Sequence, residues 1–94
     1  MTLKTYPLDP AELIQTPEDV VHFLEASFED GTSAEIAQSL GTVARSKGYA
    51  TLARAAGLSR QTLRQSLTED GNPSLDTFLK VVRALGLKLA VQAA

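Results

Sequence analysis

Five short segments with helical periodicity, each bounded by a capping residue or a glycine, constrain the fold of this chain most strongly. The first starts after Thr16, a good N-cap that is followed by Pro17, and Gly31 closes it. Ser33 is expected to cap the second segment, which stops near Gly48. Apolar side chains recur along both segments at the spacing of one helical face. The pattern predicts two amphipathic helices in the first half of the chain.

Three shorter helices are predicted in the second half, where the same start and stop signals recur. The third helix covers Tyr49–Ala56, and Gly57 supplies the left-handed residue that ends it. The fourth helix covers Arg60–Leu67. Ser74 caps the fifth helix, whose apolar face ends before Gly86. We therefore expect an all-α fold of five helices.

The last eight residues carry a different pattern. Leu87, Leu89 and Val91 alternate with a second set of residues, which is the period of a half-buried strand. A lone strand needs a partner, and the simplest source is the same strand in another copy of the chain. We therefore expect a short C-terminal β-strand and a homodimer that is joined through these three apolar residues.

Size and composition exclude several classes of protein. The 94 residues suffice for one small core and are too few for two ordinary domains. The absence of cysteine excludes disulfides, thiolate metal sites and a cysteine nucleophile, and makes the cytoplasm the default location. The sequence has neither a signal peptide nor a membrane span. Its single histidine, His22, has no neighbouring ligand set, so we expect no metal, no cofactor and no enzymatic activity.

The charges are distributed unevenly along the chain. Residues 1–40 contain one base and eight acids, whereas residues 41–94 contain eight bases and three acids. The formal net charge of −2 is therefore the near-cancellation of an acidic half and a basic half. Such asymmetry suggests a basic surface for a polyanion and an acidic surface for something else. Two solvated faces without a partner would produce the same pattern.

Residues 49–67 meet the requirements of a helix-turn-helix. This motif needs a short first helix, a small residue where the two helices touch, a glycine in the turn, and a second helix with one buried stripe. Ala53 is the small contact, Gly57 allows the turn, and Leu58 fills the core behind it. Leu63 belongs to the inward stripe of the second helix. The spacing predicts a DNA-binding motif.

The second helix of this motif leaves four polar side chains facing outward. They are Arg60, Gln61, Arg64 and Gln65, and no acidic residue occurs between residues 60 and 68. Arg and Gln form paired hydrogen bonds with guanine and adenine in the major groove, so these four are the predicted base-reading residues. Further residues suit the phosphates of double-stranded DNA. The predicted phosphate contacts are Ser59, Tyr49, Thr51, Arg54 and Thr62.

The sequence also resembles a known family. The runs Gly57-Leu-Ser-Arg-Gln-Thr-Leu and 71–89 resemble the lambda-repressor-like (Xre) helix-turn-helix domain. Three earlier runs, 9–13, 24–31 and 36–48, resemble the probable addiction-module antidote proteins, which are HigA-like antitoxins. Together these runs extend over almost the whole chain.

The resemblance implies both an architecture and a function. The fold would be a lambda-repressor-like domain over residues 1–94, with an acidic N-terminal helical extension in 1–32, a helix-turn-helix core in 33–86 and the strand in 87–94. The function implied is that of a bacterial type II antitoxin that binds a RelE/ParE-like toxin and represses its own operon as a dimer. Many relatives of the wider Xre class place Gln at the start of the first motif helix, where this chain has Tyr49.

The toxin partner that the resemblance implies suggests a function for the acidic half. A toxin that cleaves RNA must present cations to its substrate, so an acidic surface could cover them. The residues predicted for this role are Glu18, Glu25, Glu29 and Asp30. Three alternatives stay open: a merely solvated helix face, a solitary transcriptional regulator without a toxin, and a protein-interaction module that has lost DNA binding.

Overall fold

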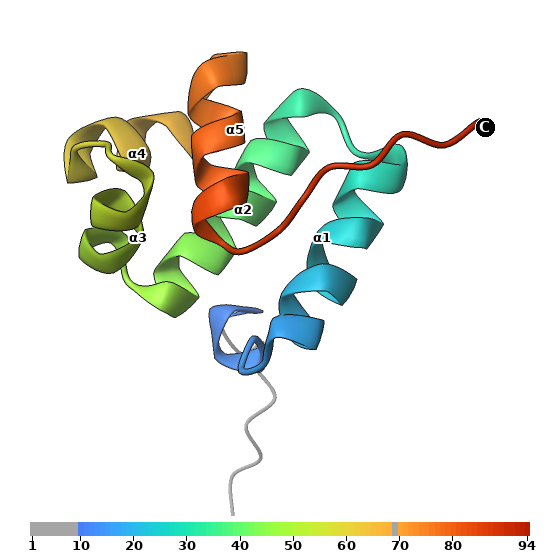
Figure 1. The fold of residues 1–94 in the computed structure, drawn as a ribbon, viewed down its shortest axis with the longest axis horizontal. Helices are drawn as coiled ribbons and strands as arrows, with labels where there is room; N and C mark the ends of the chain where they lie inside the picture. The colour runs from blue at the N-terminus through green and yellow to red at the C-terminus, as the bar shows by residue number, and fades with distance from the viewer. Residues whose placement is uncertain (1–9, 69) are drawn as a thin grey trace, which may run out of the picture.

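The computed structural model describes residues 10–68 and 70–94, and its regular structure is entirely helical (Figure 1). One turn of 3-10 helix precedes five α-helices. The all-α core expected from the sequence is therefore confirmed. In chain order the elements are η1 (Pro10–Leu13), α1 (Pro17–Asp30), α2 (Ser33–Lys47), α3 (Tyr49–Ala56), α4 (Arg60–Ser66) and α5 (Leu75–Ala84).

Helix α1 begins with a reciprocal capping box. The Thr16 Oγ1 accepts a hydrogen bond from the Asp19 backbone N–H at 3.1 Å, and the Asp19 carboxylate accepts one from the Thr16 N–H at 3.0 Å. The Gln15 N–H donates to the same carboxylate at 2.9 Å. These backbone donors from Gln15 and Thr16 stabilise the charged form and lower the pKa of Asp19. The cap predicted at Thr16 is thus confirmed.

The N-cap of helix α2 lies one residue earlier than the sequence predicts. Thr32 is the N-cap, with its Oγ1 accepting from the Glu35 N–H at 3.2 Å, and Ser33 is already the first helical residue. The Glu35 carboxylate accepts from the Thr32 N–H at 2.8 Å, which completes a second capping box. Thr32 prevails over Ser33 because only Thr32 has a glutamate at the third helical position.

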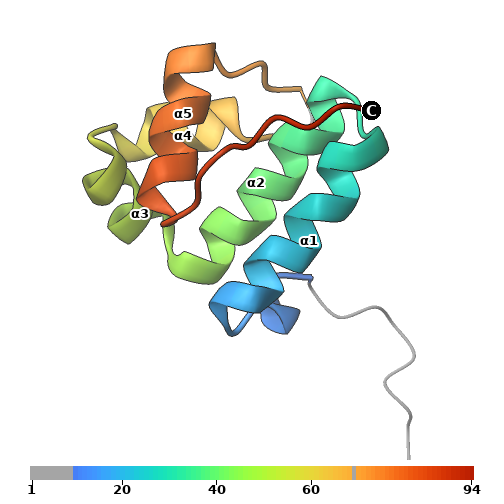
Figure 2. The same ribbon diagram turned by 45° about the vertical axis from the view of Figure 1, so that its right-hand side comes forward.

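The core lies between α2 and the helices on its two sides. Helix α1 packs along one side of α2, and α3, α4 and α5 form a second group on the other side (Figure 2). Leu40 and Val43 of α2, Leu63 of α4 and Val81 of α5 are the largest fully buried side chains. Burying a side chain of this size stabilises the fold by about 1.5–3 kcal/mol.

A glycine allows α2 to approach the end of α4 closely. A Cβ atom built on Gly41 would lie 2.2 Å from the backbone carbonyl oxygen of Leu67. Only glycine leaves room for that carbonyl, because ordinary van der Waals contact begins near 3.4 Å. Gly41 therefore helps to set where α4 lies, although glycine is an unfavourable residue inside a helix.

The C-terminal β-strand predicted from residues 87–94 is wrong. Within the described part of the chain no strand forms, and these residues run irregularly from the end of α5 to the C-terminal end of α1 (Figure 1). Leu87 packs against the core, whereas Val91 is 98% exposed. Alternating hydrophobicity produces a strand only when a second strand supplies a hydrogen-bonded ladder, and the described chain offers none.

Two other boundaries differ from the sequence prediction. Helix α4 ends at Ser66, and Leu67 caps it instead of continuing it. Helix η1 lies ahead of the first helix that the sequence predicts, and residues 1–9 lie outside the described residues. The segment between η1 and α1 is held in place by Ile14, whose side chain is buried. The backbone carbonyl of Ile14 accepts a hydrogen bond from the Ser46 hydroxyl at 3.0 Å.

No helix within residues 10–68 and 70–94 combines the length and the hydropathy that a membrane-spanning segment needs.

Candidate nucleic-acid interface

Helices α3 and α4 form the bend that the sequence predicts between residues 49 and 67. Gly57 ends α3 with a φ of 73°, a left-handed conformation that glycine adopts without strain. The Leu58 N–H then donates to the Ala53 carbonyl at 2.9 Å, and the Gly57 N–H donates to the Arg54 carbonyl at 3.3 Å. This pair of bonds is a Schellman motif, which turns the chain sharply after α3.

The start of α4 is fixed by its own cap. The Ser59 Oγ accepts a hydrogen bond from the Thr62 N–H at 3.0 Å and donates one to the Thr62 Oγ1 at 2.8 Å. The Ser59 hydroxyl is therefore engaged within the protein, whereas the Thr62 hydroxyl keeps its proton available for another acceptor. Both residues are exposed, as a phosphate contact would require.

Packing of α4 separates a buried face from an exposed one. Leu63 is fully buried against α3, and Leu67 is 2% exposed just after the helix. The four predicted base-reading residues, Arg60, Gln61, Arg64 and Gln65, are all exposed. Neither arginine forms an ion pair with an acid in the described ranges 10–68 and 70–94, and α3 and α4 contain no acidic residue.

Tyr49 occupies a different position from the other predicted phosphate contacts. Thr51 and Arg54 are exposed along α3, but Tyr49 is half-buried and its ring packs against the core. The guanidinium carbon of Arg64 lies 4.8 Å from the centroid of this ring. Such a distance is within the range of a cation–π interaction. Sequence reasoning missed this pair, because no local periodicity connects residues 15 positions apart.

Three of the four predicted acidic residues share one stripe on α1. Glu18, Glu25 and Glu29 are spaced seven and four residues apart, which places them on one side of a helix, and all three are exposed. We call these three residues the acidic stripe. His22 lies within it, with its Nδ1 3.7 Å from the Glu25 carboxylate. Asp30 lies roughly a third of a turn round the helix, since 3.6 residues complete one turn.

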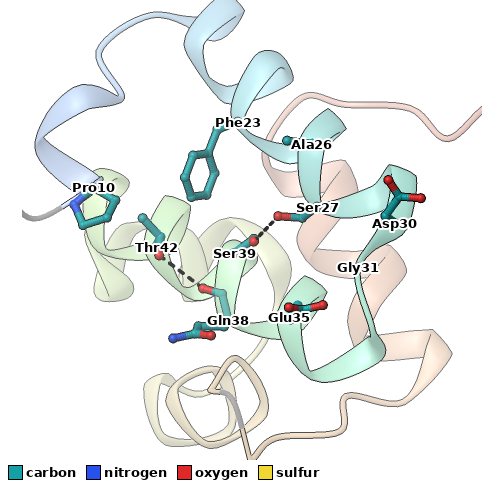
Figure 3. A pocket seen from close by; sticks show the side chains of 10 residues that line it. All are labelled: Pro10, Phe23, Ala26, Ser27, Asp30, Gly31, Glu35, Gln38, Ser39 and Thr42. Carbon is teal, nitrogen blue, oxygen red and sulfur yellow. Dashed lines mark hydrogen bonds between the residues drawn. The ribbon is translucent and has the colours of Figure 1, made fainter.

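Asp30 instead lines a hollow of about 510 Å³ between α1 and α2 (Figure 3). Two hydrogen bonds join polar groups that line the hollow. The Ser27 and Ser39 hydroxyls share a hydrogen bond, and the Thr42 hydroxyl donates to the Gln38 carbonyl at 3.2 Å. Both hydrogen bonds pair a hydroxyl with another hydroxyl or with a backbone carbonyl, neither of which is a general base.

The three residues predicted for dimerisation have different surroundings. Leu87 closes a Schellman turn after α5, where its N–H donates to the Val82 carbonyl at 3.1 Å, and its side chain packs against the core. Leu89 is 46% exposed beside α1, and Val91 is almost wholly exposed. Of these three residues, Leu89 and Val91 are therefore the ones whose apolar side chains are exposed to another molecule.

The described residues contain no group of three or more His, Cys, Asp or Glu side chains that could hold a metal ion.

Comparison with known proteins supplies information that the geometry does not. A family model described as "Probable addiction module antidote protein" matches residues 4–93. A protein of Haemophilus influenzae (strain ATCC 51907 / DSM 11121 / KW20 / Rd), described as uncharacterized, is 34% identical over 92 residues. That alignment covers 98% of this chain and 95% of the relative. No solved structure matches significantly.

Proposed function

This chain belongs to the family of probable addiction module antidote proteins, and from that premise we propose that it binds operator DNA through α3 and α4 and a toxin through the acidic stripe. The antidote family itself implies a toxin partner. The finer proposal is an antitoxin that neutralises a RelE/ParE-like toxin and represses its own operon. The two activities use opposite charges and different helices.

The exposed face of α4 is the observation that carries the DNA-binding proposal. It presents Arg60, Gln61, Arg64 and Gln65 to solvent on a helix whose other face is fixed by the buried Leu63. Arg pairs with the O6 and N7 atoms of guanine, and Gln pairs with the N6 and N7 atoms of adenine. An ordinary solvent-exposed helix face more often carries both basic and acidic residues, whereas this face contains no acidic residue.

Phosphate contacts are proposed for the exposed groups around this face. Arg54 of α3 adds a cation, and the hydroxyls of Thr51 and Thr62 add hydrogen-bond donors. These contacts position the motif on the duplex and carry no base information. These contacts also allow a chain of net charge −2 to bind DNA. Binding is driven by counterions released from the phosphates that the protein contacts, so the local charge of the contact surface matters more than the net charge.

Operator binding is proposed to involve two copies of the chain. A helix-turn-helix dimer places its two recognition helices in successive major grooves, about 34 Å apart. The exposed apolar side chains of Leu89 and Val91 support a self-association surface away from α4. This surface needs no strand pairing, since an apolar contact between irregular segments suffices to bury both side chains.

A titration with matched charge deletions tests the DNA-binding proposal. Arg60→Ala should weaken binding to the DNA upstream of the gene by about 1–3 kcal/mol and relax preference over a scrambled duplex. Lys80→Ala removes the same charge from α5, outside the helix-turn-helix and the C-terminal segment, and should leave affinity nearly unchanged. Wild-type affinity should fall as salt rises, with two chains bound per operator. Equal losses from both variants would contradict the assignment of α4 as the reading helix.

The acidic stripe supports the toxin-binding part of the proposal. Its three glutamates are exposed, and none forms an ion pair with Lys or Arg in the part of the chain that the structure describes. Carboxylates without a cationic partner are available to a cationic surface, and complementary charge raises association rates and excludes wrong partners. Asp30, on the other side of α1, would contact the toxin only if the interface extended toward the α1–α2 hollow.

A further inference from the structure

We propose that Tyr49 is the positioning residue for Arg64, holding its guanidinium over the aromatic ring so that it meets a base edge in one orientation. This inference rests on the proposed DNA binding by α4. It assigns Tyr49 a role different from the phosphate contact expected from sequence. The observation that carries it is the 4.8 Å separation between the Arg64 guanidinium carbon and the ring centroid.

The ring of Tyr49 can act as a fixed platform. Tyr49 is the first residue of α3, it is half-buried, and its ring packs against the hydrophobic core. Packing holds an aromatic ring in one rotamer, so its position does not depend on DNA being present. Arg64, in contrast, is exposed on α4 and would sample many rotamers without a partner.

Contact with a ring orients a guanidinium without using its hydrogen-bond donors. The N–H groups of arginine lie in the plane of the guanidinium, and a cation over an aromatic face is attracted by the π electrons alone. An ion pair with a carboxylate would occupy the same donors. Arg64 has no such partner among the described residues, so its planar fork stays available for guanine.

Arg60 provides an internal comparison on the same helix face. It is exposed like Arg64 but contacts no aromatic ring within the described residues. A positioning effect of Tyr49 should therefore couple to Arg64 and not to Arg60. This difference separates positioning from any general effect of Tyr49 on the stability of α3, which would affect both arginines alike.

The test is a pair of double-mutant cycles in the full chain, measured against operator DNA and a scrambled duplex. We expect Tyr49→Leu to weaken operator binding by about 2- to 5-fold, the value of an exposed cation–π contact, while binding to the scrambled duplex is unchanged. Tyr49→Phe keeps the ring and should preserve operator binding. In an Arg64→Ala background Tyr49→Leu should have no further effect, whereas with Arg60→Ala the two losses should add.

A measurement on the free protein keeps the inference separate from the DNA-binding proposal. The ring current of Tyr49 should shift the NMR signals of the Arg64 side chain upfield, and Tyr49→Leu should abolish this shift. The inference is overturned if the wild type lacks the shift, if Tyr49→Leu leaves operator preference intact, or if Tyr49→Phe weakens both duplexes equally, as loss of a phosphate contact would. Failure of the wild type to bind either duplex would overturn the proposed function and this inference with it.

Discussion

Replacing Gly41 with alanine sets two physical effects against each other. Helix propensity favours the substitution, because alanine inside a helix is about 0.8–1 kcal/mol better than glycine. Packing opposes it, because the new Cβ would lie 2.2 Å from the Leu67 carbonyl oxygen, which belongs to the backbone and cannot rotate away. Restoring ordinary contact requires α2 and the end of α4 to separate by about 1 Å.

The structure therefore predicts that Gly41→Ala destabilises the protein. Overpacking a close contact typically costs about 1–3 kcal/mol, and a backbone obstacle belongs at the upper end of that range. After subtraction of the propensity gain, the expected net loss is about 1–2 kcal/mol. For a domain of this size such a loss lowers the Tm by roughly 4–16 °C.

Thermal and urea denaturation followed by circular dichroism will measure this loss. Gln38→Ala, an exposed position on the same helix, is the matched control and should change stability by less than about 0.5 kcal/mol. Because Leu67 directly follows α4, operator binding by Gly41→Ala should also weaken at temperatures where the variant is folded. A raised Tm for Gly41→Ala would refute the reasoning, since it would mean that helix propensity outweighs the close contact.

Two further predictions concern the acidic half. Replacing the three glutamates of the acidic stripe with lysine should abolish co-purification with the toxin. Three charge reversals elsewhere, at Glu12, Asp70 and Asp76, should preserve it. If the stripe variant still binds the toxin, the acidic stripe is not the toxin-binding surface. Acidification should weaken the α1 cap, because the pKa of Asp19 is lowered in the folded state. The contribution of the Asp19 carboxylate to stability is therefore fully present above its unfolded pKa of about 3.9 and is lost as the pH falls through the lower folded pKa. Asp19→Asn should flatten the pH dependence of stability in that acidic window, and an unchanged slope would contradict the role of the carboxylate.

Helix boundaries were largely predictable because their causes are local. The caps at Thr16, Ser59 and Ser74 and the left-handed turn at Gly57 each depend on residues only a few positions apart. The one misplaced cap shows the same principle, because Thr32 and Ser33 are adjacent hydroxyl residues. Only Thr32 lies three residues before Glu35. The correct cap can therefore be predicted only when the hydroxyl residue and the glutamate are considered as a pair.

The candidate DNA face was predictable for a similar reason. Once Leu63 is assigned to the core, the helical repeat places Arg60, Gln61, Arg64 and Gln65 outside, and their exposure agrees with that assignment. The acidic residues were less predictable, because a count of charges does not say which side of α1 each one occupies. Their spacing along the helix separates Asp30 from the acidic stripe.

The five α-helices, their order and the polar face of α4 were predictable from the sequence, since they follow from interactions within one or two helical turns. Contacts between distant residues, such as Tyr49 with Arg64 and Gly41 with Leu67, were not predictable and are seen only in the folded chain. The same holds for residues 87–94, which form no strand. Their alternating pattern is compatible with a strand but forms one only beside another strand. Contacts between segments depend on how the helices pack around α2, and no local pattern encodes that arrangement.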